Sequence, residues 1–250
     1  MAASLSLLSP AAEPASLSQV WRAAELGQVD GGVVPTGHGA LDAQLPGGGW
    51  PLGAMIEVLQ QQAGAHEWAL LLPALARRAG AHSGPVVLVG APYVPFGPAL
   101  AAHGLPSERL LWIDVAAPAA RLWACEQALR CADAAAVLAW LPQARASALR
   151  RLHMAAQDGG KLFFVCRSVA AQHESSAASL RLRLGGLETM TVDIFKRRGP
   201  PLPAPLLLPA RAPRLAALLA ASRARRSPPP MATVLSFRSG HALDRVAAAA

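Results

Sequence analysis

The chain has 250 residues, 53% of them apolar, and a formal net charge of +8 at pH 7. Its apolar fraction excludes a disordered chain, and its length suits one α/β core of ordinary size with additional segments. Residues 79–107 form the longest uncharged window, but five prolines interrupt it, so it cannot be a transmembrane helix. The first basic residue is Arg22, so no secretory signal is expected and we predict a soluble cytoplasmic protein.

The basic residues gather near the C-terminus. Residues 196–250 contain ten Arg or Lys and one acid, which leaves 13 basic and 14 acidic residues in the other 195. A near-neutral body with a basic tail indicates an anionic partner, and nucleic acid is the first candidate. The candidate phosphate contacts are Lys196, Arg197, Arg198, Arg223, Arg225 and Arg226. The alternative, a tail that is only solubilising, stays open.

The first predicted element is a helix over residues 16–26, inside an N-terminal segment that we assign to residues 1–32. Residues 37–44 are compatible with a helical turn. The glycines of residues 46–53 predict a tight turn into a strand at residues 54–59, because glycine adopts backbone angles closed to other residues.

Strands and helices then alternate. Short, nearly continuous apolar runs are typical of strands buried on both faces of a parallel sheet. After the strand at 54–59, such runs occupy residues 85–90, 110–114, 135–141 and 161–166. Helical patterns occupy residues 67–79, 98–103, 117–131 and 143–157. This order predicts an α/β fold with a mostly parallel sheet, right-handed crossovers and helices on both faces.

The sheet is expected to end in a β-hairpin. Residues 179–184 and 188–196 alternate polar and apolar side chains around Gly185-Gly186. The predicted core domain therefore covers residues 33–198.

Beyond the hairpin, residues 199–250 form a Pro/Ala/Arg-rich basic tail that we predict to be largely flexible. Its prolines exclude regular structure over residues 199–213, whereas residues 213–226 are compatible with a short helix.

One segment carries a family resemblance. Residues 35–59, PTGHGALDAQLPGGGWPLGAMIEVL, resemble the opening of a RecA-type recombinase core, where a strand leads into the ATP-binding loop. The more specific resemblance is to the ImuA family of translesion-synthesis accessory proteins, also described as RecA-like or SulA-like. Further similar positions are Val20-Trp21-Arg22, Leu70-Leu71-Leu72-Pro73-Ala74-Leu75, Ala139-Trp140-Leu141-Pro142 and Lys196-Arg197-Arg198-Gly199. The GGGWP block is more specific than the apolar runs.

The ATP-binding loop itself is missing from the sequence. Such a loop needs GxxxxGK[ST] between a strand and a helix. The chain contains only two lysines, and both are misplaced: Lys161 begins a strand, and Lys196 ends one. Where the loop lysine is expected, His66 or Glu67 stands instead, and an acid at the start of a helix repels phosphate. Trp140 replaces the acid that would organise magnesium, so we predict no ATP hydrolysis.

No other catalytic set appears. The seven histidines have no metal-ligand spacing, there is no GxSxG elbow, and the three cysteines form no CxxC pair. Asp42 and Asp114 are expected to stabilise turns or cap helices. Most of the six tryptophans are expected in the core, and Trp21 and Trp50 are the candidate partner contacts.

The resemblance implies a noncatalytic RecA-like scaffold of SOS-induced translesion synthesis, without cofactor, metal or membrane contact. Its implied partners are the polymerase-like protein ImuB, an error-prone DnaE-type polymerase, RecA and DNA. The alternative function is that of a SulA-like inhibitor, which binds the cell-division GTPase FtsZ.

Overall fold

The computed structural model describes residues 32–211 together with residues 217, 221, 222 and 225. The chain divides into two compact units, residues 1–210 and 211–250. The helix predicted over residues 16–26 lies outside the described residues. Of the helix predicted over residues 213–226, the four described residues are helical.

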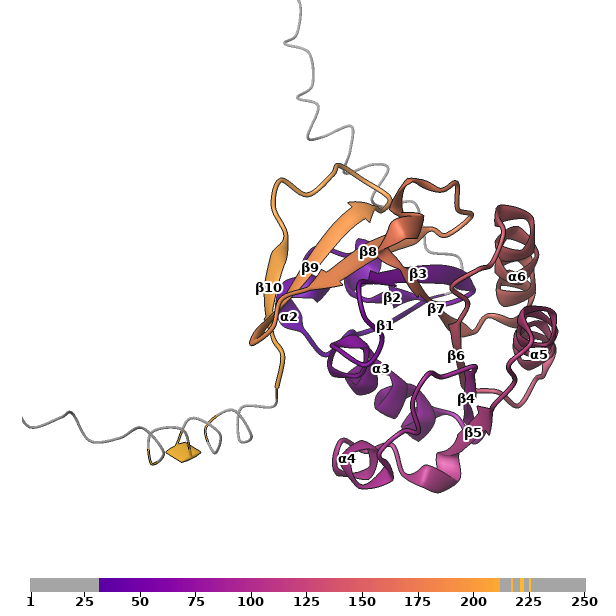
Figure 1. The fold of residues 1–250 in the computed structure, drawn as a ribbon, viewed down its shortest axis with the longest axis horizontal. Helices are drawn as coiled ribbons and strands as arrows, with labels where there is room; N and C mark the ends of the chain where they lie inside the picture. The colour runs from indigo at the N-terminus through magenta and orange to yellow at the C-terminus, as the bar shows by residue number, and fades with distance from the viewer. Residues whose placement is uncertain (1–31, 212–216, 218–220, 223–224, 226–250) are drawn as a thin grey trace, which may run out of the picture. The chain divides into compact units, whose positions relative to one another are not determined.

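The first unit contains an eight-stranded sheet (Figure 1). Its strands are β3 (Ala54–Gln60), β4 (Val86–Val89), β5 (Leu110–Ile113), β6 (Ala136–Trp140), β7 (Leu162–Ser168), β8 (Leu180–Gly185), β9 (Thr189–Lys196) and β10 (Leu206–Pro209). Their order across the sheet is β10-β9-β8-β3-β7-β6-β4-β5. The six strands from β8 to β5 are parallel, whereas β9 is antiparallel to both β8 and β10. The predicted α/β fold with a mostly parallel sheet is confirmed.

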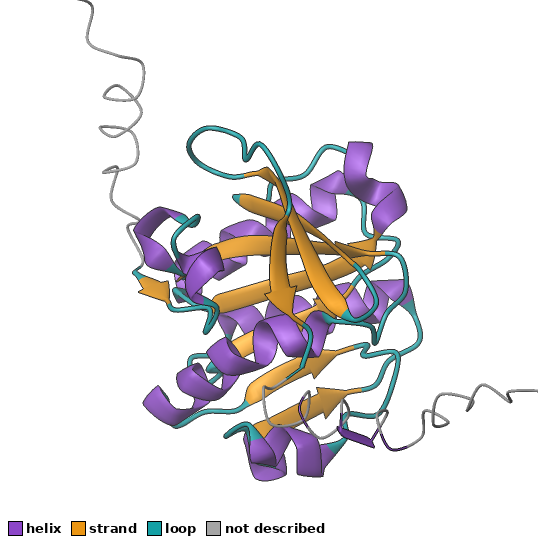
Figure 2. Cartoon of the chain, turned by 90° about the vertical axis from the view of Figure 1, so that its left-hand side faces the viewer, coloured by secondary structure: helices purple, strands orange, loops and turns teal. Residues whose placement is uncertain are grey.

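Helices cover both faces of this sheet (Figure 2). They are α2 (Gly39–Asp42), α3 (Glu67–Ala81), α4 (Gly97–Ala102), α5 (Pro118–Arg130) and α6 (Ala146–Gly159). Alternate strand residues supply two apolar layers: Ile56 packs in the layer that contains α3 and α4, and Met55 packs in the layer that contains α5 and α6. Both layers include fully buried side chains from the central strands, which explains the continuous apolar runs.

A small second sheet forms where only a turn was predicted. Val33–Val34 (β1) pairs antiparallel with Trp50–Pro51 (β2), after a short 3-10 helix at Pro46–Gly48. A Cβ atom at Gly49 would lie 2.4 Å from the backbone oxygen of Val34, so only glycine permits this close approach. The glycine block therefore brings β2 against β1.

The prediction that residues 199–213 form no regular structure is wrong. Leu206–Pro209 forms β10, and the compact unit continues to Ala210 instead of ending near Arg198. Proline is tolerated in an edge strand, because one side of that strand has no partner in the sheet. Leu208 is buried and Leu207 is 68% exposed, which is the alternation of a half-buried strand.

Candidate functional site

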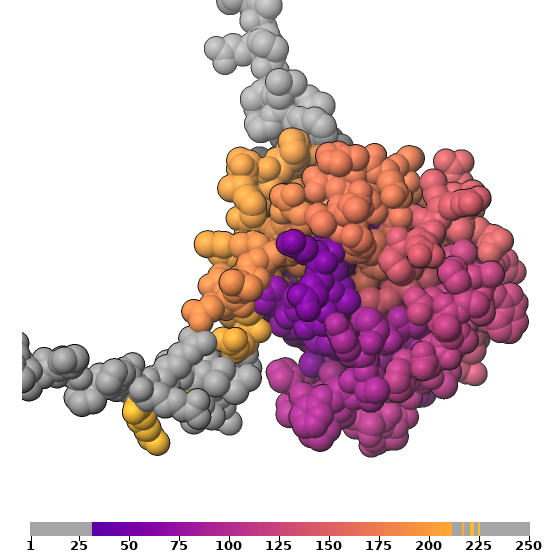
Figure 3. Space-filling view, in the orientation of Figure 1, coloured from indigo at the N-terminus to yellow at the C-terminus, as the bar shows by residue number. Residues whose placement is uncertain are grey.

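The loop between β3 and α3 lies at the carboxyl edge of the sheet, where the parallel strands end, and side chains of the loop and of α3 bind backbone groups there. Glu67, the first residue of α3, is buried, and its Oε1 accepts a hydrogen bond from the Gly64 backbone N–H at 2.5 Å. The Nε2 atom of His66 lies 2.8 Å from the Gly186 carbonyl oxygen at the β8–β9 turn. Figure 3 shows purple residues from early in the described chain against the orange C-terminal strands. Glu67 therefore occupies a backbone donor of the kind that binds phosphate.

Buried apolar side chains lie at the same end of the central strands as Glu67. Trp140, at the end of β6, is buried, and its ring centroid lies 6.3 Å from that of Trp68 on α3. Cys166 on the adjacent strand β7 is also buried; burial, and then the negative charge of Glu67, raise the pKa of its thiol. These surroundings disfavour a bound anion, since a second negative charge would meet Glu67 in an apolar environment.

Both lysines lie at the opposite end of the strands. We call this end, where the parallel strands begin, the amino edge of the sheet, and the end where they finish the carboxyl edge. Lys161 precedes β7, and its Nζ donates to the carbonyl oxygens of Ala132 and Ala134 at 3.3 and 3.2 Å. Lys196 ends β9 and donates to the carbonyl oxygen of Ser176 at 2.9 Å. Burial is the main cause that lowers the pKa of each ammonium group. Neither lysine is placed to contact a ligand at the loop after β3.

One loop at the carboxyl edge carries three exposed apolar side chains. Tyr93, Val94 and Phe96, in the loop after β4, are 61%, 73% and 71% exposed. A Cβ atom at Gly64 would lie 3.0 Å from the Tyr93 ring, so this loop packs on the loop after β3. We call Tyr93, Val94 and Phe96 the aromatic rim. Apolar groups gathered in this way on a surface loop are typical of protein interaction sites.

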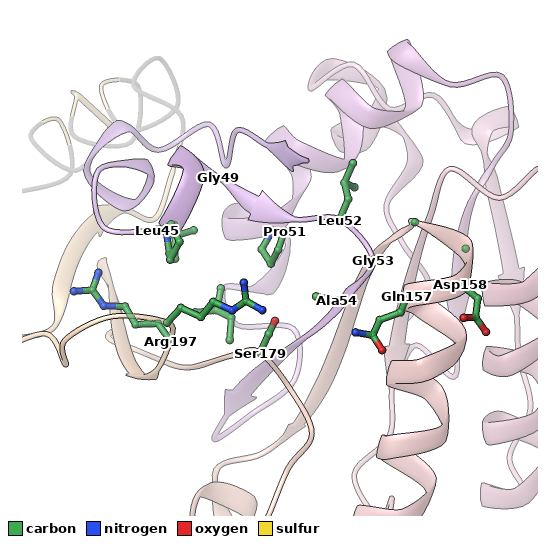
Figure 4. Close-up of a pocket in the computed structure, with 15 residues that line it drawn as sticks. Leu45, Gly49, Pro51, Leu52, Gly53, Ala54, Gln157, Asp158, Ser179 and Arg197 are labelled. Atoms are coloured by element: carbon green, nitrogen blue, oxygen red, sulfur yellow. The ribbon is translucent and has the colours of Figure 1, made fainter. Parts of the chain in front are cut away.

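The amino edge carries a pocket of about 470 Å³ (Figure 4). Its apolar lining comes from both sides of β2 and from the starts of β3 and β8: Leu45, Pro46, Pro51, Leu52, Ala54 and Leu180. Its polar lining includes Gln157 and Asp158 from the end of α6, Ser179, Arg197 and Arg198. A volume of this size is within the range of pockets that hold small ligands or side chains.

The two arginines of this pocket differ. Arg197 donates through Nε to the Pro200 carbonyl oxygen at 2.8 Å, and through Nη1 to the Gln44 carbonyl oxygen. Arg198 is exposed. Of the predicted phosphate contacts, the structure therefore brings Lys196, Arg197 and Arg198 to one edge.

The remaining site predictions have different outcomes. Arg225 is exposed and helical in the second unit, whereas Arg223, Arg226 and Trp21 lie outside the described residues. The prediction that Trp50 contacts a partner is wrong: its side chain is fully buried and meets Phe164 edge-on at 5.3 Å between ring centroids. The close approach of Gly49 to Val34 brings β2 against β1, and the Trp50 side chain points into the core.

Sequence reasoning missed a buried ion cluster in the centre of the sheet. Glu57 on β3 is fully buried between Arg167 on β7 and Arg181 on β8, with N···O distances of 2.9 and 2.5 Å. Arg167 also pairs with Glu174 at 2.7 Å. The available signal was the charged residues inside apolar runs, one each in AMIEVL and LFFVCRS and two in SLRLRL, because charges inside buried strands must be paired.

Neither a scan of protein-family models nor a search of curated proteins found a match for this chain. In the part of the chain that the structure describes, no helix is long and apolar enough to cross a membrane. The same residues contain no group of three or more His, Cys, Asp or Glu side chains that could hold a metal ion.

Proposed function

We propose that the chain is a noncatalytic, RecA-like accessory protein of the ImuA type, which assembles translesion-synthesis proteins and does not turn over nucleotide. The observation that carries this proposal is the Glu67 carboxylate on the Gly64 N–H. A phosphate at this loop would have to displace a buried acid, and no lysine lies there to compensate its charge.

The fold is compatible with this proposal. An eight-stranded, mostly parallel sheet flanked by helices is compatible with a Rossmann or RecA-like arrangement. The strand that would precede an ATP-binding loop, β3, is central in the sheet, and its loop is followed directly by α3. This arrangement supports the proposal that the chain retains a nucleotide-binding architecture without the phosphate chemistry.

A partner-binding role is supported by the aromatic rim at the edge where α/β proteins hold ligands. We expect the rim to contact the ImuB-type partner. The DnaE-type polymerase and RecA belong to the same proposed assembly. Lys196, Arg197, Arg198 and the C-terminal arginines are the proposed DNA contacts, with binding that weakens as salt rises.

Affinity capture with purified ImuB and purified FtsZ tests this function. We expect ImuB to bind, and the rim variant Phe96→Asp to weaken binding about 30-fold, the effect of losing a contact worth about 2 kcal/mol. Met154→Asp, at a 53% exposed apolar position on α6, is the matched control and should bind normally. Binding to FtsZ alone would refute the proposal in favour of the SulA-like alternative.

A further inference from the structure

The amino-edge pocket has walls suited to an apolar segment that also carries acids. Leu45, Pro51 and Leu52 form part of its apolar side. Arg197 and Arg198 outnumber Asp158, the one acid in the lining, so the pocket lining carries a net positive charge. An amphipathic chain segment with carboxylates would match both properties, because apolar burial stabilises it and the guanidinium groups pair with its acids.

The described chain begins at this pocket. The Leu52 backbone N–H donates to the Gly32 carbonyl oxygen at 3.0 Å, and Val33 pairs with Pro51 in the small sheet. Leu52 and Pro51 both line the pocket. Gly32, the first described residue, is therefore held at the pocket wall, and a chain from residue 26 to residue 32 is long enough to span about 20 Å. Such a short tether gives the preceding segment an effective concentration of order millimolar.

The sequence of that preceding segment complements the pocket. Residues 1–31 lie outside the described residues, but they contain three acids and one arginine, a side-chain charge of −2. Within them, the sequence of the helix predicted over residues 16–26 has apolar residues on both sides of Trp21 and an acid at Glu25. The C-terminal segment is a poorer occupant, because residues 196–250 hold ten basic residues against one acid and would meet two arginines.

We propose that residues 17–26 of the chain's own N-terminal segment occupy the amino-edge pocket. Trp21 enters the apolar side formed by Leu45 and Leu52, and Glu25 lies against Arg198. The segment thereby covers two of the arginines proposed to contact DNA. This inference does not depend on the proposed function, since it requires neither ImuB nor any other partner.

Fluorine NMR of the full chain labelled with 5-fluorotryptophan tests this docking. The Trp21 resonance is assigned with Trp21→Phe. We expect it to lie away from the free-indole position and to shift little between H2O and D2O. Ser179→Phe, which fills the pocket, should move it to the free position, and Arg198→Glu should move it part of the way. Arg150→Glu, an exposed arginine on α6, is the matched control and should leave it unchanged.

Trp50 and Trp140 report whether each variant is folded, because both are buried in the core. If Ser179→Phe shifts these two resonances, Arg198→Glu becomes the deciding variant. A Trp21 resonance at the free position in the unaltered chain overturns the proposal. The proposal is also overturned if the Trp21 resonance lies away from the free position and stays there in the deciding variant, because the segment then docks elsewhere.

Discussion

The two edges of the central sheet have opposite character. At the carboxyl edge, Glu67 and His66 bind backbone groups of the neighbouring loops, and the exposed aromatic rim lies in the loop after β4. At the amino edge, a pocket of about 470 Å³ has two arginines in its lining. Open α/β sheets ordinarily bind ligands at the carboxyl edge.

The difference shows that the two ends of the strands in one sheet offer different binding surfaces. At the carboxyl edge, the Glu67 carboxylate accepts a hydrogen bond from the Gly64 backbone N–H. Positive charge and free volume instead occur together at the amino edge, near the end of β9.

The largest effect is expected from Glu57, midway along the strand β3 that joins the two edges. Glu57→Leu leaves the buried guanidinium groups of Arg167 and Arg181 without their shared carboxylate. We expect the free energy of unfolding to fall by about 3–5 kcal/mol, measured by chemical denaturation. The partly exposed pair of Arg183 and Asp193 is the control, and Arg183→Gln should cost about 1 kcal/mol or less. Equal losses would contradict this view of the cluster.

Trp50, below the amino edge, should give the next largest effect. Trp50→Ala removes a fully buried ring and its edge-on contact with Phe164. We therefore expect the free energy of unfolding, measured by chemical denaturation, to fall by about 3–5 kcal/mol. Trp123→Ala, at a 64% exposed position on α5, should change stability by about 0.5 kcal/mol or less. A stable Trp50→Ala chain that loses only partner binding would restore the surface role that the structure contradicts.

Glu67 tests how the carboxyl-edge loop is held. In Glu67→Ala, the Gly64 N–H loses its acceptor, and a hydrogen bond worth about 1.5 kcal/mol corresponds to roughly tenfold faster amide exchange. Hydrogen exchange at Gly64 measures this directly. Glu108→Ala, an exposed acid before β5, should leave that rate unchanged. Unaltered exchange at Gly64 in Glu67→Ala would show that the carboxylate does not hold the loop.

The smallest effect concerns pH and the amino edge. Burial, and then the charge of Lys196, lower the pKa of His153, whose Nδ1 accepts from the Met55 N–H at 3.1 Å. The unfolded chain therefore binds this proton more readily, and stability should fall as pH drops from 6.5 toward the lowered pKa. Since the ring is only partly buried, we expect about 0.5 kcal/mol or less. Denaturation of His153→Gln should lack this slope, whereas that of His103→Gln should keep it.

The sequence predicted the elements whose signals are local and strong. Continuous apolar runs such as 135–141 mark β6, and the alternation around Gly185 marks the β8–β9 hairpin. The absence of a lysine after β3 was also visible directly. These features depend on one segment at a time, so a single sequence suffices to find them.

Features that depend on two distant segments escaped prediction. Glu57 meets Arg167 and Arg181 only once β3 lies between β7 and β8. Leu206–Pro209 becomes a strand because β9 offers it a free edge, which outweighs its prolines. Trp50 turns inward because Gly49 lets β2 approach β1. In each case tertiary pairing decided the outcome.

The most direct measurement is calorimetric titration of the full chain with ATP and magnesium. Because Glu67 holds the Gly64 N–H and no lysine lies near, we expect no saturable binding at ligand concentrations up to about 1 mM. Stoichiometric binding with a micromolar Kd would contradict the central proposal that this edge of the sheet binds no nucleotide.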